Sequence, residues 1–472
     1  MIDKREILDA AARYSLNPHV VEKDYALGWM LAGIYAHPDL TDSWIFKGGT
    51  CLKKCFFETY RFSEDLDFTL TNPEHLDEGF LKRVFAEIGQ WVQEQSGLEI
   101  PPDRQDFELL KNPRGNPSCQ GKISYCGPVS SKPGLPRVKL DLTADERVIL
   151  PPVRTSIFHP YSDVPEEGIE VLAYDYVEAF AEKFRALIER TRPRDLYDVV
   201  HLYRNAEARP DPAHFREVLH QKCAFKGMEV PLVTALDAHR DELEAGWIHM
   251  LNHQLPSLLP VEAFWSELAD IFAWMSGEVL PTVLEAMPFG ADHEIIRDQV
   301  VVSAGEGNQS HIEIIRFASA NRLIVELDYI DQAGKRSVRA IEAYSFRRSR
   351  AGAVLLMAVR EEDGQPRSYN LRQIMGVVPT QRIFTPRYPI ELSPTESPNI
   401  PRLGRGASVA RIARPVRRSA PIRSSGLTYQ FRCAVCGKVF SRKTYDAAMN
   451  THKGRNGYDC YGSYGIYVGT KY

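Results

Sequence analysis

The spacing of apolar residues divides the first half of the chain into helices and strands. Residues 20–35 carry apolar side chains at helical period, which predicts a long helix. Residues 43–47 (SWIFK) and 65–70 (DLDFTL) predict short strands, and 137–143 (RVKLDLT) alternates polar and apolar residues, as a strand at the edge of a site does. Helices are expected over 51–60, 80–96 and 169–190, with Pro193 as the first residue of another.

The pattern changes near Asp298. From Pro210 to about Met287 it is mostly helical, whereas beyond Asp298 residues 313–323 predict a helix and Gly-containing turns separate short strands. A small helix-plus-sheet module is therefore expected, with strands at 324–331, 337–345, 353–359 and 366–370.

Composition sets the broad class of the protein. A chain of 472 residues exceeds the usual size of one domain, so two to four domains are expected. No apolar run is long enough to span a bilayer and the amino terminus has no signal-peptide core, which predicts a cytoplasmic protein without a membrane partner. The eight cysteines are scattered except for one CxxC, a pattern that favours a metal site over a disulfide framework.

Charge is distributed unevenly along the chain. The net charge is −4, yet the residues from Pro394 to the end carry 14 lysines and arginines against three acids. Residues 394–426 are rich in Pro, Gly, Ser and Arg, which predicts a flexible basic linker. A basic tail on an acidic body suggests electrostatic binding of DNA or RNA.

The segment 46–70 (FKGGTCLKKCFFETYRFSEDLDFTL) carries the strongest chemical signal. Gly48 and Gly49 separate a strand from a helix, where backbone N–H groups can approach a triphosphate, and Thr50 adds a hydroxyl. Asp65 and Asp67 are two residues apart on the next strand, so both carboxylates point to one face and can hold Mg²⁺. The alternative is an ordinary hairpin with acids on its solvent face.

Five motifs extend this signal along the chain. They are Glu22-Lys23-Asp24-Tyr25, Phe46-Lys47-Gly48-Gly49-Thr50, Arg61-Phe62-Ser63-Glu64-Asp65-Leu66-Asp67, Glu182-Lys183-Phe184-Arg185-Ala186-Leu187 and Arg192-Pro193-Arg194-Asp195-Leu196-Tyr197-Asp198. Together they resemble the AbiEii/AbiGii family of toxin nucleotidyltransferases, and the resemblance covers roughly residues 15–285. It implies a polymerase-β-like, α+β catalytic domain that transfers a nucleoside monophosphate from a nucleoside triphosphate.

The resemblance also implies roles for individual residues, and each has a structural alternative. Lys183 would contact the triphosphate, or be a solvated helix residue. Asp195 belongs to the last functional motif, or offsets a helix dipole. By geometry, Asp141 on 137–143 is a candidate third carboxylate for Mg²⁺, or an exposed strand acid. The implied catalytic residues are Asp65, Asp67, Lys183 and Asp195, and the implied nucleotide-binding residues are Gly48, Gly49, Thr50 and Lys183.

The module near residues 312–382 resembles a WYL domain, a small Sm-like β module associated with sensing of ligands or nucleic acids. The tripeptide that names this family would align with Val354-Leu355-Leu356, so both of its aromatic residues are absent. The fold expectation is therefore stronger than any expectation of a ligand pocket. A purely structural β module is the alternative.

The last segment has the ligand types of a zinc site. Cys433, Cys436, His452 and Cys460 can supply four ligands to a tetrahedral Zn²⁺. The segment resembles a C2H2-type finger, although it has an insertion and Cys460 replaces the second histidine. Cysteines without metal are the alternative, which is less favoured because so short a segment has little apolar mass to fold alone.

These observations predict a division into 1–205 (nucleotidyltransferase), 206–295 (helical extension), 296–393 (WYL-like), 394–426 (basic linker) and 427–472 (zinc-finger-like). The expected function is Mg²⁺-dependent transfer of a nucleoside monophosphate to tRNA or another RNA, in a toxin–antitoxin or phage-defence role with a cognate antitoxin. Two alternatives remain open, namely nucleotidylylation of a protein hydroxyl and a nucleic-acid-binding regulator whose nucleotidyltransferase domain is not catalytic.

Overall fold

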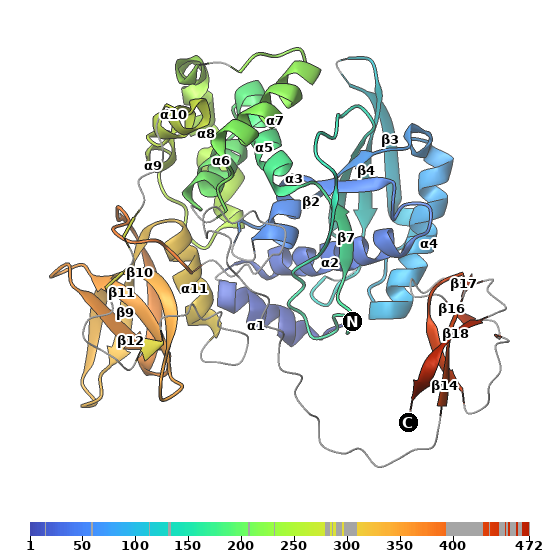
Figure 1. The fold of residues 1–472 in the computed structure, drawn as a ribbon. Helices are drawn as coiled ribbons and strands as arrows, with labels where there is room; N and C mark the ends of the chain where they lie inside the picture. The colour runs from blue at the N-terminus through green and yellow to red at the C-terminus, as the bar shows by residue number, and fades with distance from the viewer. Residues whose placement is uncertain are drawn as a thin grey trace.

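A mixed α/β body, a separate β-rich region and a small β-stranded tail make up the chain (Figure 1). The computed structural model describes residues 1–472 except for 15, 58–59, 113, 131–133, 206–207, 231, 279–283, 286, 289–294, 297–308, 393–427, 434, 443–448, 450–451, 454–458, 461–464 and 472. The expected basic linker, residues 394–426, therefore lies outside the described residues.

The body is built around a seven-stranded sheet of order β3-β4-β5-β2-β1-β7-β6. β2 pairs antiparallel with β1 and parallel with β5, which puts β2 at the centre of the sheet. The strands are β1 (Trp44–Lys47), β2 (Asp65–Leu70), β3 (Gln105–Lys111), β4 (Pro117–Ser124), β5 (Arg137–Thr143), β6 (Val153–Ser156) and β7 (Glu170–Ala173).

The alternating sequences of β2 and β5 explain which face of this sheet is the core. Leu66 and Phe68 on β2, with Leu140 and Leu142 on β5, are buried on one face, while the intervening polar residues point to the other. Helices α2 (Pro18–Ala36) and α4 (Glu78–Ser96) pack against each other and against sheet strands. The strands expected at 65–70 and 137–143 are confirmed.

Side-chain caps define where several helices begin. The side chain of Asn17 accepts a hydrogen bond from the backbone N–H of His19 at the start of α2, and that of Asp77 accepts from Phe80 at the start of α4. The helix expected after the glycine pair begins earlier, at Gly48. It runs as α3 (Gly48–Cys51) and continues as one π-helical turn, Leu52–Phe56.

The prediction of a single helix over 169–190 is wrong for its first residues. Residues Glu170–Ala173 form β7, which pairs parallel with β1 and antiparallel with β6, and only Tyr176–Arg190 is helical (α5). Asp175 caps the helix through its side chain, which accepts from the N–H of Val177. Sheet pairing decides the conformation here, because a four-residue apolar stretch does not distinguish strand from helix.

Helices α6 to α10 lie in the upper left of Figure 1. Pro193 begins α6, as expected, and the pyrrolidine ring suits this position because the first helical N–H has no partner. The further helices are α6 (Pro193–Arg204), α7 (Pro212–Phe225), α8 (Arg240–Leu251), α9 (Glu262–Trp265) and α10 (Leu268–Ser276), with 3-10 turns at Val233–His239 and Asn252–Gln254.

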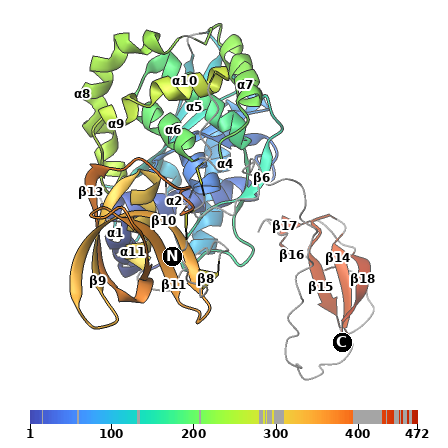
Figure 2. The same ribbon diagram turned by 60° about the vertical axis from the view of Figure 1, so that its left-hand side comes forward.

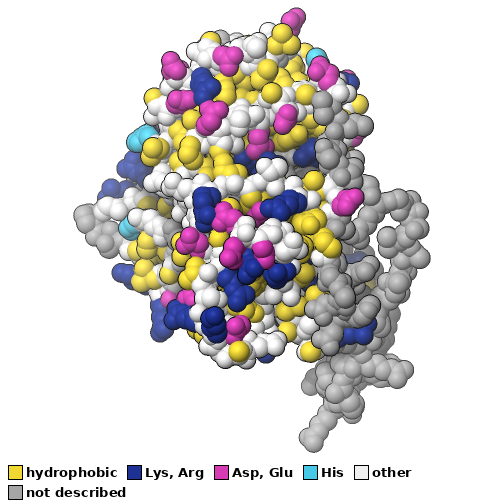
Figure 3. All heavy atoms as spheres, turned by 90° about the vertical axis from the view of Figure 1, so that its left-hand side faces the viewer, with side chains coloured by type: hydrophobic (Ala, Val, Ile, Leu, Met, Phe, Trp, Pro, Cys, Tyr) yellow, Lys and Arg dark blue, Asp and Glu magenta, His cyan; other side chains and the backbone are white. Residues whose placement is uncertain are grey.

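The β-rich region has a second sheet of order β12-β11-β10-β9-β13, and β8 pairs with β10. Its helix α11 contacts α1 (Lys4–Tyr14) of the body as well as β9 and β13, as Figure 2 shows. On the face in Figure 3, basic and acidic side chains are interspersed. The elements are α1, β8 (Ile295–Ile296), α11 (Gln309–Ala320), β9 (Leu323–Ile330), β10 (Arg336–Ser349), β11 (Val354–Arg360), β12 (Pro366–Asn370) and β13 (Ile374–Ile383).

Candidate active site

Three carboxylates lie on the face of the central sheet opposite its core. The parallel register of β2 and β5 places Asp67 beside Asp141 and Asp65 beside Lys139. Residues paired in this way point their side chains to the same face, so the three half-buried aspartates share one surface. The spacing of Asp65 and Asp67 in the sequence is enough to place both on one face of β2. The position of Asp141 beside them depends on the pairing of β5 with β2.

The three acids repel one another. Burial and then the charge of Asp141 raise the pKa of Asp67 to about 6, although Lys183 and Lys47 oppose the shift. Burial and then the charge of Asp65 raise the pKa of Asp141. Hard oxygen ligands with this excess of negative charge suit a divalent cation such as Mg²⁺.

The aspartates are not gathered into a closed metal site. Among the described residues, the group of three or more acids, histidines and cysteines whose ligand atoms all lie within 4.8 Å of one another is in the tail. Asp65, Asp67 and Asp141 therefore fit a cation by their chemistry and shared face, and their side chains would have to draw together to hold it.

The glycine turn lies directly against this face. Gly48 has a φ of 81°, and a Cβ atom there would lie 2.1 Å from Oδ2 of Asp67. A Cβ atom on Gly49 would lie 2.9 Å from Nη2 of Arg61. Both positions need glycine, because a side chain would displace either the carboxylate or the arginine.

Thr50 has a different surrounding from the one expected. It is buried, and its hydroxyl donates a hydrogen bond of 2.5 Å to the backbone oxygen of Asp65. The side chain thus ties the first turn of α3 to the start of β2. A phosphate would meet this turn at its backbone N–H groups rather than at the Thr50 hydroxyl.

Lys183 on α5 lies close enough to the acids for its charge to lower the pKa of Asp67. Its Nζ lies 2.9 Å from Oδ2 of Asp198, which is fully buried and also accepts hydrogen bonds of 2.6 and 2.7 Å from Arg61. Although burial alone would raise the pKa of Asp198, Arg61 and Lys183 hold it well below its usual range. Asp198 therefore fixes the position of both cations.

Lys47 is a second lysine that the spacing argument missed. It lies opposite Asp67 in the β1–β2 register, and its Nζ is 3.2 Å from Oε1 of Glu182. Glu182 also lies 3.3 Å from Nζ of the buried Lys222. The motif containing Glu182 was recognised in the sequence, but only the fold shows that it holds Lys47 beside the acids.

Asp195 is buried rather than open to the site. Its carboxylate accepts hydrogen bonds of 2.8 and 2.9 Å from Arg190, whose side chain is 45% exposed. The charge of Arg190 acts on Asp67 and Asp141, so the guanidinium lies near the acidic face. Arg194 approaches the same face, with its Nη1 3.8 Å from Oδ2 of Asp65. Neither arginine was singled out from the sequence.

The first motif has structural contacts. Asp24 forms a buried ion pair of 2.7 Å with Lys54, and Lys23 lies 2.6 Å from Glu64, directly before β2.

In the β-rich region, Val354, Leu355 and Leu356 lie at the start of β11, with Val354 and Leu356 buried. The three apolar side chains at 354–356 supply packing and no reactive group.

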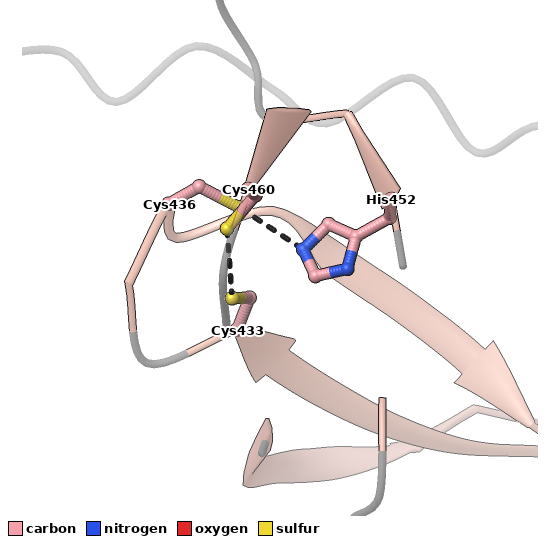
Figure 4. Close-up of side chains that lie close together, drawn as sticks. All are labelled: Cys433, Cys436, His452 and Cys460. Atoms are coloured by element: carbon pink, nitrogen blue, oxygen red, sulfur yellow. Dashed lines mark hydrogen bonds between the residues drawn. The ribbon is translucent and has the colours of Figure 1, made fainter. Parts of the chain in front are cut away.

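The four predicted ligands of the tail come together (Figure 4). Sγ of Cys433 lies 3.7 Å from Sγ of Cys460, and Sγ of Cys436 lies 3.5 Å from Nε2 of His452. The backbone N–H of Cys436 is the main cause that lowers the pKa of the Cys433 thiol to about 6. Three thiols and one imidazole at these separations match the donor set of a tetrahedral zinc site.

The tail differs from a C2H2 finger in its described elements, which are all strands. Cys433 ends β14, and His452 on β16 pairs directly with Cys460 on β17. Phe431 and Met449 are buried beside the cluster, with Phe440 packed against them. The strands are β14 (Thr428–Cys433), β15 (Val439–Arg442), β16 (His452–Lys453), β17 (Asp459–Cys460) and β18 (Gly465–Lys471).

A mixed α/β sheet with acids on one face, beside a glycine turn and lysines, is the arrangement expected of a nucleotidyltransferase-like fold. The family model described as "Nucleotidyl transferase AbiEii toxin, Type IV TA system" matches residues 29–271, more than half of the chain. The chain therefore belongs to the AbiEii family of toxin nucleotidyltransferases.

Solved structures with similarity to the chain include MenT4, the nucleotidyltransferase toxin Rv2826c from Mycobacterium tuberculosis H37Rv, which is 18% identical with a TM-score of 0.35 and covers 58% of this chain and 90% of that one. JHP933 from Helicobacter pylori is 17% identical with a TM-score of 0.33, covering 56% and 94%. A putative nucleotidyltransferase from H. pylori is 16% identical with a TM-score of 0.34, covering 56% and 100%. No curated protein matches. Among the described helices, none is long and apolar enough to cross a membrane.

Proposed function

We propose that this chain transfers a nucleoside monophosphate from a nucleoside triphosphate to a hydroxyl of tRNA or another RNA, as the toxin of a toxin–antitoxin or phage-defence pair. The observation that carries the proposal is the shared face of Asp65, Asp67 and Asp141 beside the turn at Gly48. Family membership supports the reaction class, and a cognate antitoxin is the partner that a toxin of this family requires.

The carboxylates would hold Mg²⁺, which when bound supplies a Lewis acid for the transferred phosphoryl group. An oxygen of the acceptor hydroxyl forms a bond to the α-phosphorus, and the bond from that phosphorus to pyrophosphate breaks. Asp141, which lies beside Asp67 on the same face, would be a third ligand of Mg²⁺, and the acceptor hydroxyl loses its proton to water. Asp65 and Asp67 have the role of metal ligands.

The positive groups around the acids would bind the triphosphate. Lys47 is held by the half-buried Glu182 and Lys183 by the buried Asp198, and this fixed geometry suits stabilisation of charge on the leaving pyrophosphate. Backbone N–H groups at Gly48 and Gly49 would contact phosphate oxygens. Asp195 acts as a positioning residue in this proposal, because it contacts Arg190 and is itself buried.

The tail and the β-rich region have supporting roles in the proposal. Cys433, Cys436, His452 and Cys460 would hold one structural Zn²⁺, supported by their mutual distances. The β-rich region would act as a WYL-like module that senses a ligand or nucleic acid. The basic tail would add affinity for DNA or RNA through contacts to phosphates.

The test is incubation of the full chain with each labelled triphosphate, Mg²⁺ and total cellular RNA, followed by separation of RNA from protein on a gel. We expect label in RNA with the native chain and none with the Asp65→Ala/Asp67→Ala variant. Label in protein instead would favour nucleotidylylation of a protein hydroxyl. No label with any triphosphate, together with retained nucleic-acid binding, would favour the non-catalytic regulator.

A further inference from the structure

An open groove of about 570 Å³ lies beside the acidic face, at the amino ends of β2 and β5. Glu64 immediately precedes β2 and Pro136 immediately precedes β5, and both line the groove. Because β2 and β5 are parallel, their first residues lie at the same edge of the sheet. The groove therefore lies at the edge of the sheet where β2 begins with Asp65 and β5 begins with Arg137.

The wall of the groove is held in place from inside the protein. Glu22 on α2 is fully buried, and its carboxylate accepts hydrogen bonds of 2.5 and 2.8 Å from the backbone N–H groups of Val129 and Ser130, which line the groove. A Cβ atom on Gly127 would lie 2.5 Å from Oε1 of Glu22, so the loop approaches as closely as its backbone allows. The groove is thus a built feature of the described fold.

Exposed cations extend from the groove along β5. In the groove itself Lys23 is paired with the acid Glu64 at 2.6 Å, and Lys4 adds a further positive charge. Positive charge continues along β5. The outward residues of this strand, in order from the groove to the acids, are Arg137, Lys139 and Asp141. Arg137 and Lys139 are exposed, and Lys139 lies beside Asp65 in the parallel register.

The spacing of these cations suits successive phosphates of an extended strand. Residues two apart on a β-strand lie about 7 Å from each other, so Arg137 and Lys139 can contact different phosphates. They also approach the acids from the groove, whereas Lys47 and Lys183 are held by carboxylates of α5 and α6. The two sets of cations are thus separate, and each can serve a different substrate.

We infer that the groove and the outward face of β5 bind a single strand of the acceptor RNA, with Arg137 and Lys139 guiding its terminal hydroxyl to the carboxylates. The inference rests on the proposed function and adds the place and orientation of the acceptor. RNA is favoured over a protein acceptor because the cations follow one line and are exposed, an arrangement that neutralises a phosphodiester backbone.

The test compares two double variants of the full chain, each lacking two positive charges. Arg137→Ala/Lys139→Ala removes the cations of β5. The control, Lys82→Ala/Arg154→Ala, removes exposed cations from α4 and β6, whose side chains are 58% and 41% exposed. Thermal unfolding confirms that both variants fold, and KM is measured separately for labelled triphosphate and for a purified RNA that the native chain labels.

The β5 variant should raise the KM for RNA at least about tenfold and change the KM for triphosphate less than about twofold. Its RNA-binding constant should depend less steeply on salt, with a slope smaller by about 1.4 for two lost contacts to a single strand. A further variant, Leu135→Asp in the groove, should also raise the KM for RNA. The control should leave all three quantities near native values.

Unchanged RNA KM and salt slope in the β5 variant would overturn the groove as the acceptor site, while the native chain would still label RNA and the proposed function would stand. An equal rise in both KM values would also overturn it, because Arg137 and Lys139 would then serve the triphosphate. A native chain that labels protein and no RNA would overturn the proposed acceptor and the groove inference together.

Discussion

Replacement of Asp67 by asparagine should abolish transfer and make the folded chain more stable at neutral pH. In the unfolded chain this carboxyl has the ordinary pKa of 3.8, whereas burial and the charge of Asp141 raise it to about 6 in the fold. As pH rises between these values, the unfolded state loses its proton first. The free energy of unfolding therefore falls through this window, and the full loss is present above pH 6.

The size of the effect follows from the two pKa values. A carboxyl whose pKa rises from 3.8 to about 6 loses about 3 kcal/mol of stability in its charged form. An amide has the same shape and no charge, but it still needs hydrogen bonds in a half-buried place, so a gain of about 1–3 kcal/mol is expected. At about 2–4 °C per kcal/mol for a domain of 150–250 residues, that corresponds to roughly 2–12 °C in Tm.

Thermal unfolding in EDTA at pH 7.5 and pH 5 measures this effect for the native chain and Asp67→Asn. The gain at pH 5 should be about half of that at pH 7.5, because much of the native Asp67 is then protonated. Asp103→Asn is the control, since its side chain is 77% exposed, and it should change Tm little at either pH. Mg²⁺ should raise the Tm of the native chain more than that of Asp67→Asn.

Two results would refute the reasoning. If Asp67→Asn has the native Tm at pH 7.5 without metal, Asp67 is not under electrostatic repulsion in the fold. If the gain is equal at pH 5 and pH 7.5, it comes from packing and not from the carboxylate charge. Inactivity without added stability would leave the catalytic role intact and remove the electrostatic explanation.

Three further predictions concern the other parts of the site and the tail. Lys183→Ala should reduce kcat/KM about a hundredfold or more, as expected for a lost charge contact to the transition state, and a variant with native steady-state kinetics would contradict this role. Asp195→Asn and Arg190→Ala should each raise the KM for triphosphate about tenfold, and the double variant should be no worse than either, whereas additive effects would mean that Asp195 does not act through Arg190. Metal analysis of the purified protein should find one zinc per chain, lost in Cys433→Ser/Cys436→Ser, and equal zinc in both proteins would exclude this site.

The local pattern of the sequence was sufficient for the strands that carry the acids. β2 and β5 coincide with the expected ranges, because alternation of apolar and polar residues over six or seven positions specifies both a strand and its two faces. The spacing of Asp65 and Asp67 therefore determined that they share a face. The four tail residues were also identified by type, since cysteine and histidine are the usual ligands of zinc.

Only the tertiary structure decided which distant groups meet. Asp141 joins the acids because β5 pairs parallel with β2, and Asp198 holds Arg61 and Lys183 because α6 packs beside α5. The alternating apolar pattern of a strand specifies its faces but not its neighbours or their register. For the same reason the stretch 170–173 was expected to be helical, whereas pairing with β1 and β6 makes it a strand. Contacts between residues far apart in the chain depend on packing of the whole fold, so the sequence alone could name the candidate acids but not the charges arranged around them.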